Sequence, residues 1–200
     1  MPLRDPIDPL GTYHVGSRGT YGRTLFRTRG EHDLFLELYD KIASKYDWRT
    51  LAWTLMKNHH HFVIELTNGG LSEGMRELHG GYSRRIHAAY GQTRKGHLFR
   101  HAFFARLLVD ERAVVGASAY VDLNPSANRR LASARRTDWC SYAATLGLER
   151  SRPFHNPERL LRLIATDKSR ARSEYRALTV EIHASRQRKP SPNDGVQTET

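Results

Sequence analysis

The sequence contains a single cysteine, Cys140, among its 200 residues. One thiol excludes an intramolecular disulfide and a zinc site built from several cysteines, so Cys140 is expected to pack or cap next to Trp139. No apolar run approaches the roughly 18 residues of a membrane-spanning helix, and the N-terminus has no hydrophobic signal segment. These absences predict a cytoplasmic protein.

Acidic residues are too few to balance the basic ones. The chain has 32 lysines and arginines against 21 aspartates and glutamates, which gives a net charge of +11. A soluble basic protein without such a partner could also show an excess of basic residues. The size of the positive charge favours a polyanionic partner, in the first place nucleic acid. A nucleic-acid partner would place the protein at the nucleoid. The hydrophobic share of 38% and the length suit one packed domain.

Hydrophobic periodicity predicts the main elements of the fold. Alternation predicts strands at residues 12–18, 49–55, 59–66 and 102–109, and helical spacing predicts helices at 31–46, 71–90 and 111–123. Two further helices are expected after the caps Asn156 and Asp167. This order predicts an α+β fold with a ferredoxin-like antiparallel sheet and helices on one face. The expected division is a leader at 1–10, a main domain at 11–145, a helical extension at 146–184 and a disordered tail at 185–200.

Three consecutive histidines open the predicted strand at 59–66. Residues two apart in a strand share a face, so His59 and His61 should stand side by side while His60 points the other way. The set with His60 is the more apolar and should face the helices, which leaves His59 and His61 on an open face where a substrate could lie. Imidazole is a common metal ligand, so the pair indicates a metal site. A polar strand start is the alternative.

Tyr120 and Asn124 lie four residues apart and therefore on the same face of the predicted helix. Together they could supply a nucleophile and a third metal ligand. The residues alone leave open the simpler interpretation, in which Tyr120 packs in the core and Asn124 caps the helix before Pro125.

Five segments, in order, make the chain similar to the single-tyrosine transposases of the HUH (His-hydrophobic-His) class, above all the REP-associated tyrosine transposases. They are Tyr13-His14-Val15-Gly16-Ser17-Arg18-Gly19, Met56-Lys57-Asn58-His59-His60-His61-Phe62, the stretch 82–99 ending in Gly96-His97-Leu98-Phe99, Tyr120 to Pro125, and Trp139-Cys140-Ser141-Tyr142. The resemblance covers roughly residues 12–142.

The resemblance implies a role for each of four residues. His59 and His61 would bind a divalent metal, Mg²⁺ or Mn²⁺, and Asn124 would supply a further ligand. Tyr120 would attack a phosphodiester and leave a 5′-phosphotyrosine and a free 3′-hydroxyl. The implied partner is single-stranded DNA, often with a nearby hairpin, and the chain would act as a monomer or a homodimer.

The sequence departs from the family pattern at three places. His60 replaces the apolar middle residue of the histidine motif and is expected to be a buried, neutral imidazole with one hydrogen bond. Lys57 stands where the family has proline, and the residues Arg100-His101-Ala102 replace the usual pattern after Gly96-His97-Leu98-Phe99. None of these changes removes a proposed ligand or the nucleophile.

Basic side chains around the predicted sheet face are candidate phosphate contacts. They are Arg18, Arg23, Arg84, Arg85, Arg94, Lys95, Arg100 and Arg106. Tyr21 and Phe99 could stack on unpaired bases. Two alternatives to a strand transferase are a catalytically inactive or domesticated protein that binds single-stranded or hairpin DNA, and a metal-dependent hydrolase that uses water.

Overall fold

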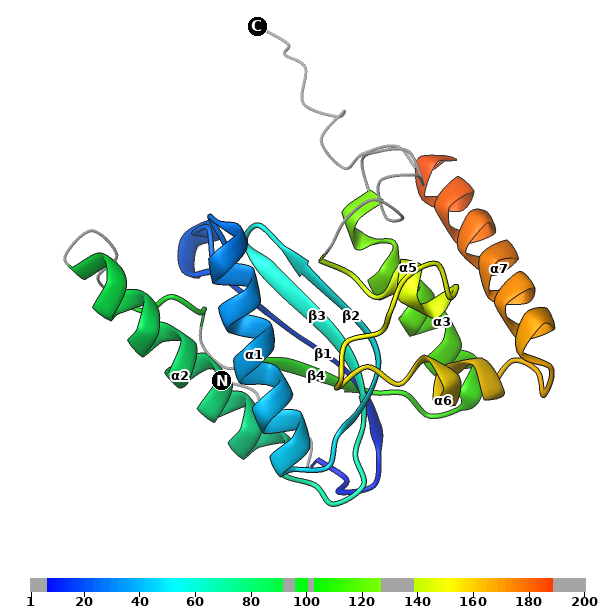
Figure 1. Ribbon diagram of the computed structural model, residues 1–200, viewed down its shortest axis with the longest axis horizontal. Helices are drawn as coiled ribbons and strands as arrows, with labels where there is room; N and C mark the ends of the chain where they lie inside the picture. The colour runs from blue at the N-terminus through cyan, green and yellow to red at the C-terminus, as the bar shows by residue number, and fades with distance from the viewer. Residues whose placement is uncertain (1–6, 92–95, 101–102, 127–138, 189–200) are drawn as a thin grey trace, which may run out of the picture.

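The chain folds as a four-stranded sheet with helices on both faces (Figure 1), as seen in a computed structural model that describes residues 7–91, 96–100, 103–126 and 139–188. The strands are β1 (Thr12–Arg18), β2 (Arg49–Met56), β3 (His59–Glu65) and β4 (Phe104–Leu107). The helices are α1 (Arg29–Lys45), α2 (Leu71–Tyr90), α3 (Glu111–Asp122), α5 (Tyr142–Thr145), α6 (Pro157–Arg162) and α7 (Lys168–Arg188). Two short 3-10 turns are η1 (Thr20–Gly22) and η3 (Asn124–Ser126).

The strands lie in the order β2-β3-β1-β4, and all neighbours are antiparallel. This confirms the predicted α+β fold with a ferredoxin-like sheet, because each helical crossover places the next strand beyond its neighbour. Both edges of the sheet are protected: β4 is only four residues long, and residues 139–141 pair with the outer edge of β2 through Leu55 and Trp53. The expected fourth strand, at 102–109, is shorter than predicted at both ends.

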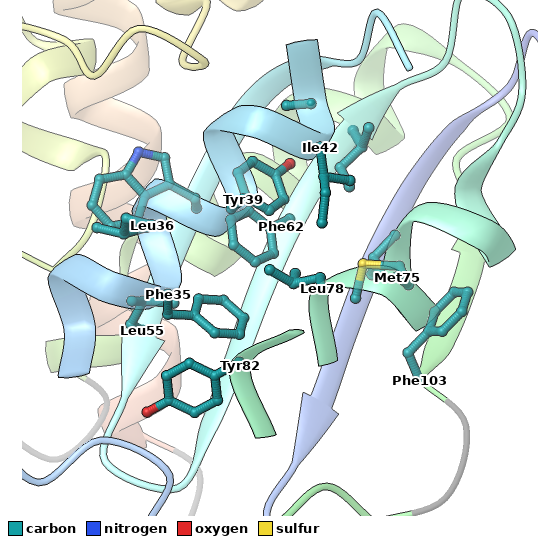
Figure 2. Close-up of a cluster of buried hydrophobic side chains, with 14 of the residues drawn as sticks. Phe35, Leu36, Tyr39, Ile42, Leu55, Phe62, Met75, Leu78, Tyr82 and Phe103 are labelled. Atoms are coloured by element: carbon teal, nitrogen blue, oxygen red, sulfur yellow. The ribbon is translucent and has the colours of Figure 1, made fainter. Parts of the chain in front are cut away.

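Helices α1 and α2 cover one face of the sheet and form the larger core. The ring of Tyr39 on α1 stacks on Phe62 of β3 with centroids 4.0 Å apart, and Figure 2 shows both rings between the helix and the strand. The Tyr39 hydroxyl is paired with the Thr50 hydroxyl at 2.7 Å, which satisfies a polar group that is fully buried. Phe62 and Ile64 face this core, as the pattern of β3 predicts.

The opposite face of the sheet is not open, as the sequence suggested, but partly covered. Helix α3 crosses it after β4, α7 packs against α3, and α6 contacts β2 and α7 (Figure 1). A second apolar cluster joins Val63 of β3 to Val114 and Val121 of α3 and to Tyr175 of α7. The face was expected to be open because β3 carries polar residues there. In the structure, the part of the face around Val63 is buried, and only the part with His59 and His61 remains partly uncovered.

A β-bulge changes the expected facing of β2. Alternation places Leu51, Trp53 and Leu55 on one face, yet only Trp53 and Leu55 join the core under α1, and Leu51 joins the α3 cluster. Thr50 pairs with Ile64 and Ala52 with Val63, so Leu51 is the extra residue of the bulge. An extra residue reverses the alternation on one side of it, which explains the error.

The C-terminal helix is longer than predicted. Asp167 caps it as expected, accepting a hydrogen bond from the Arg170 amide at 2.7 Å, but α7 continues to Arg188. Residues 185–188 are therefore helical, and the expectation of a disordered tail from 185 is wrong for these four residues. Cys140 is buried in the α3 cluster, as predicted. Among the described residues, no helix is both long and apolar enough to span a membrane.

Asp122 joins three parts of this side of the molecule. Its carboxyl group is fully buried and accepts hydrogen bonds from the Ser141 hydroxyl and, at 2.7 Å, from the Tyr175 hydroxyl of α7. Burial raises the pKa of Asp122 to about 7. The Tyr120 helix is thus held to the C-terminal extension by a buried polar contact as well as by apolar packing.

Replacing Tyr175 by phenylalanine should lower the free energy of unfolding by about 1–3 kcal/mol, because one oxygen of the buried Asp122 carboxyl loses its donor. Denaturant unfolding followed by circular dichroism measures the change. Tyr46→Phe is the matched control, since its hydroxyl donates to the exposed Glu77–Lys45 pair at the surface. Equal losses in the two variants would contradict a special role for the Asp122 contact.

Candidate functional site

His59 and His61 stand side by side on the face of β3 that α3 crosses. Their ring centroids are 5.2 Å apart. Gly16 of β1 lies opposite His61, and a side chain there would meet the His61 Nδ1 atom at 2.8 Å, so only glycine leaves room for this imidazole. His59 and His61 therefore lie on one face of β3, as the strand period predicts.

His14 of β1 belongs to the same cluster, although the sequence analysis did not select it. Its Nε2 atom lies 3.1 Å from His61 Nδ1, and its ring centroid lies 5.9 Å from that of Tyr120. The signal was present in the alternation of β1, which places His14 on the face opposite Tyr13 and Val15. Only the pairing of β1 with β3, with His14 opposite Val63, shows that this face is also that of His61.

The hydrogen bonds of the two β3 histidines suit metal ligands. Nδ1 of His59 is paired with Asn58 Oδ1 at 2.8 Å, and Nδ1 of His61 is paired with His14, which leaves the Nε2 atom of each ring for a cation. A ligating histidine usually donates its other N–H group in this way. Burial, with a contribution from Arg18, lowers the pKa of His59 to about 4 and that of His61 to about 3. Neutral imidazoles keep their lone pairs available at neutral pH.

Asn124 is the predicted third ligand. It is buried in the turn η3 that follows α3, and its Nδ2 atom donates to the Tyr120 carbonyl oxygen at 3.3 Å. This contact is with the Tyr120 backbone and not with its side chain, so the shared face stays a prediction. No hydrogen bond links it to His59 or His61 in the part of the chain that the structure describes. Within the same residues, no group of three histidine, cysteine, aspartate or glutamate side chains could hold a metal ion. The role of Asn124 stays a prediction.

Tyr120 projects from α3 toward the histidines. Its ring is 45% exposed, and its centroid lies 6.5 Å from that of His61. Arg186 of α7 covers the ring, with Cζ 4.2 Å from the centroid, and donates to the Tyr120 carbonyl oxygen at 3.1 Å. The sequence offered no signal for Arg186, because 66 residues separate it from Tyr120 and only the packing of α7 on α3 joins them. A reachable phenol, two neutral imidazoles and a guanidinium therefore share one site.

His60 points to the opposite face, as predicted. It is fully buried, and its Nε2 atom lies 3.0 Å from His79 Nε2 on α2. Burial lowers the pKa of His60 well below its ordinary value and that of His79 to about 3. The expectation of a buried, neutral imidazole with one hydrogen bond is confirmed.

These histidines should make the fold sensitive to acid. A histidine whose pKa is lowered by folding stabilises the protein above its unfolded pKa of about 6.5 and loses that contribution as the pH falls toward the lowered value. The pKa is lowered to about 4 in His14, His59 and His155 and to about 3 in His61 and His79. One pKa unit corresponds to about 1.4 kcal/mol and a domain is stable by only about 5–15 kcal/mol, so a few protonations suffice.

We therefore expect cooperative unfolding between about pH 6 and pH 4, measured by circular dichroism. Asp122 acts in the opposite sense, because its raised pKa favours the folded state at lower pH, but it is one group against several. Removing the hydrogen-bonded pair in a His60→Val/His79→Leu variant should move the midpoint to lower pH. A chain that stays folded at pH 3.5 would contradict the assignment of neutral, buried histidines.

The candidate phosphate contacts do not form one cluster. Arg18, at the end of β1, and Arg106, opposite His14 on β4, lie near the histidines, and each lowers the pKa of a neighbouring histidine. Arg84 and Arg85 are exposed on α2, on the other side of the sheet. Arg23 and Arg100 line a groove that reaches Arg18. Arg94 and Lys95 lie outside the described residues.

Comparison with known proteins points to one family. Residues 10–123 match the sequence family described as "Transposase IS200 like", which is more than half of the chain and includes His59, His61 and Tyr120. No curated protein matches the chain. Among similar solved structures is that of a REP-associated tyrosine transposase bound to a REP hairpin, with a TM-score of 0.63 and 12% sequence identity. The match covers 74% of this chain and 86% of the other.

Proposed function

Because the chain belongs to the family of IS200-like transposases, we propose that it cleaves and rejoins single-stranded DNA through a covalent bond to Tyr120. The observation that carries this proposal is the position of the Tyr120 ring. The ring is reachable from solvent and stands beside His61 and His14, which come from strands far away in the sequence. A tyrosine placed only for packing would be buried in the apolar cluster, as Tyr175 is.

The reaction exchanges one phosphodiester for another. The Tyr120 phenolic oxygen attacks the phosphorus, the bond from phosphorus to the 3′ oxygen breaks, and the phenolic proton is balanced by the proton that the leaving 3′ oxygen takes up. The products are a 5′-phosphotyrosine and a free 3′-hydroxyl. The covalent intermediate keeps the energy of the broken bond, so a 3′-hydroxyl can attack it and rejoin a strand without another energy source.

Side chains of this site have separate tasks in the proposal. His59 and His61 would hold a divalent cation, Mg²⁺ or Mn²⁺, which when bound polarises the phosphate oxygens. The guanidinium of Arg186 lies against the Tyr120 ring, where its positive charge favours an approaching phosphate. Asn58 and His14 orient the two imidazoles through their Nδ1 atoms.

The substrate we propose is single-stranded DNA that carries a hairpin, and the contact of Arg186 with Tyr120 within one polypeptide supports action as a monomer. The net charge of +11 supports a nucleic-acid partner. The similar REP-associated transposase is bound to a hairpin, which supports the hairpin in this proposal. Action at the nucleoid in the cytoplasm would follow.

A denaturing gel tests the proposal. Protein incubated with Mn²⁺ and labelled single-stranded oligonucleotides from the DNA that flanks the gene should give a band of protein joined to DNA that survives denaturation. DNA binding in a native gel without a covalent band would favour the second candidate, a DNA-binding protein without cleavage. Cleavage without a covalent band would indicate hydrolysis by water.

A further inference from the structure

A wide groove lies next to the candidate active site but outside it. Its walls are residues 18–24 with Arg27, one stripe of α2 that repeats at helical spacing (Ser72, Arg76, His79, Ser83 and His87), and residues 96–100 with Phe103. Its volume is about 1880 Å³. Pockets for small molecules have roughly 300–1,000 Å³, so the size suits a segment of a polymer.

The charge of the groove is of one sign. Arg18, Arg23, Arg27, Arg76 and Arg100 line it, and no aspartate or glutamate is among its described lining residues. Arg18, Arg76 and Arg100 form no ion pair within the described part of the chain. Guanidinium groups without a carboxylate partner are available for phosphates, so the polymer is a polyanion.

Tyr21 supplies an exposed aromatic ring at the mouth of this groove. Its side chain is fully exposed, at 102%, and its backbone adopts the left-handed region with φ 52° and ψ 36° in the turn η1. This conformation is costly for a residue other than glycine, and a large exposed ring gains nothing from packing. Stability of the free protein therefore does not explain Tyr21, but a base stacked on its ring would.

The floor of the groove is also aromatic. The rings of His79 and Phe99 stack with centroids 4.0 Å apart and an interplanar angle of 14°. Phe99 is held there because Gly19 and Phe99 form a β-bridge and the Thr20 amide donates to the Leu98 carbonyl oxygen at 2.9 Å. Flat apolar surfaces between guanidinium groups are typical of sites for unpaired nucleic acid, since paired bases stack only on each other.

One end of the groove reaches the candidate active site. Asn58, which is paired with His59 Nδ1, lines the groove, and so does Arg18, whose strand position is opposite His59. A strand lying in the groove would therefore arrive at the histidine pair from the α2 side of the sheet.

We infer that this groove binds the unpaired DNA that adjoins the cleaved bond, with bases stacked on Tyr21 and phosphates on Arg76 and Arg100. The inference rests on the proposed function for its substrate, DNA, but concerns binding and not the covalent step. It assigns the groove to unpaired nucleotides and not to the stem of a hairpin.

The test compares two DNA probes without added divalent cation: an oligothymidylate of about 12 nucleotides and a blunt hairpin without unpaired ends. Tyr21→Ala should weaken oligothymidylate binding about tenfold, and Tyr21→Phe should keep it, because stacking needs the ring and not the hydroxyl. Arg76→Gln should weaken it and reduce the slope of log affinity against log salt by about 0.7, the share of one phosphate contact on a single strand.

Arg176→Gln is the matched control, because Arg176 is exposed on α7 and does not line the groove. Its affinity for oligothymidylate should stay within about twofold of wild type, and the blunt hairpin should bind all the variants alike. The inference is overturned if Tyr21→Ala and Arg76→Gln leave oligothymidylate binding unchanged. It is equally overturned if both variants weaken the blunt hairpin as much, which would make the groove a duplex site.

The covalent assay separates this inference from the proposed function. If the wild-type protein forms no covalent band but Tyr21→Ala and Arg76→Gln still weaken oligothymidylate binding, strand transfer is wrong and the groove assignment holds. If the covalent band forms and the groove variants bind oligothymidylate normally, strand transfer holds and the groove assignment is wrong.

Discussion

Tyr120→Phe is expected to reduce the yield of covalent protein–DNA adduct and of cleaved strand by at least about a thousand-fold, because the variant lacks the oxygen that would attack the phosphorus. The ring that contacts Arg186 and lies near His14 remains, so folding and DNA binding should change little. A denaturing gel measures the adduct, and a native shift with the same oligonucleotide measures binding.

Two tyrosines serve as controls for this result. Tyr21→Phe, in the turn η1, should keep the adduct because the ring remains, and Tyr175→Phe should keep it at temperatures where that variant is folded. Cleavage by Tyr120→Phe at the rate of the wild type would remove Tyr120 as the nucleophile, whatever the protein does to DNA. Loss of DNA binding together with the adduct would mean instead that Tyr120 holds the fold or the strand.

His59→Ala and His61→Ala should each weaken Mn²⁺ binding by at least about a hundred-fold, and strand cleavage should fall with it. Loss of a group that only orients a metal ligand typically costs about 10–100-fold in affinity, and loss of the ligand itself costs more. Titration of Mn²⁺ followed by electron paramagnetic resonance measures the affinity without DNA and so does not depend on the reaction.

The neighbouring histidine is the control for this pair. His60→Val changes the residue between them, but His60 faces α2 and is paired with His79, so Mn²⁺ binding should stay within about threefold of wild type. Unchanged Mn²⁺ binding in both His59→Ala and His61→Ala would show that the cation, if one binds, lies elsewhere. Thermal unfolding of each variant shows whether the chain is still folded when the affinity is measured.

Local pattern predicted most elements of the fold. The bounds of β1 and α2 agree with the periodicity, and the caps Asn156 and Asp167 mark the starts of α6 and α7. These features depend on neighbours within a few residues, where sequence spacing and spatial distance agree. The bulge at Leu51 broke the alternation, and no local signal announced it, because a bulge depends on the register with the partner strand.

The candidate site divides in the same way. The shared face of His59 and His61 follows from the period of a strand. His14 and Arg186 entered the site only in the folded molecule. His14 is brought beside His61 by strand pairing, and Arg186 is brought over Tyr120 by the packing of α7 on α3.

The sequence by itself determined which residues can do chemistry and which face of its own element each one occupies, since these are properties of a few consecutive residues. The tertiary structure decided that α3 crosses the histidine face, that this face is only partly open, and that a basic groove reaches it from the α2 side. The physical reason is that contacts between distant segments depend on how whole elements bury their apolar faces against one another. No short segment of the chain determines that packing.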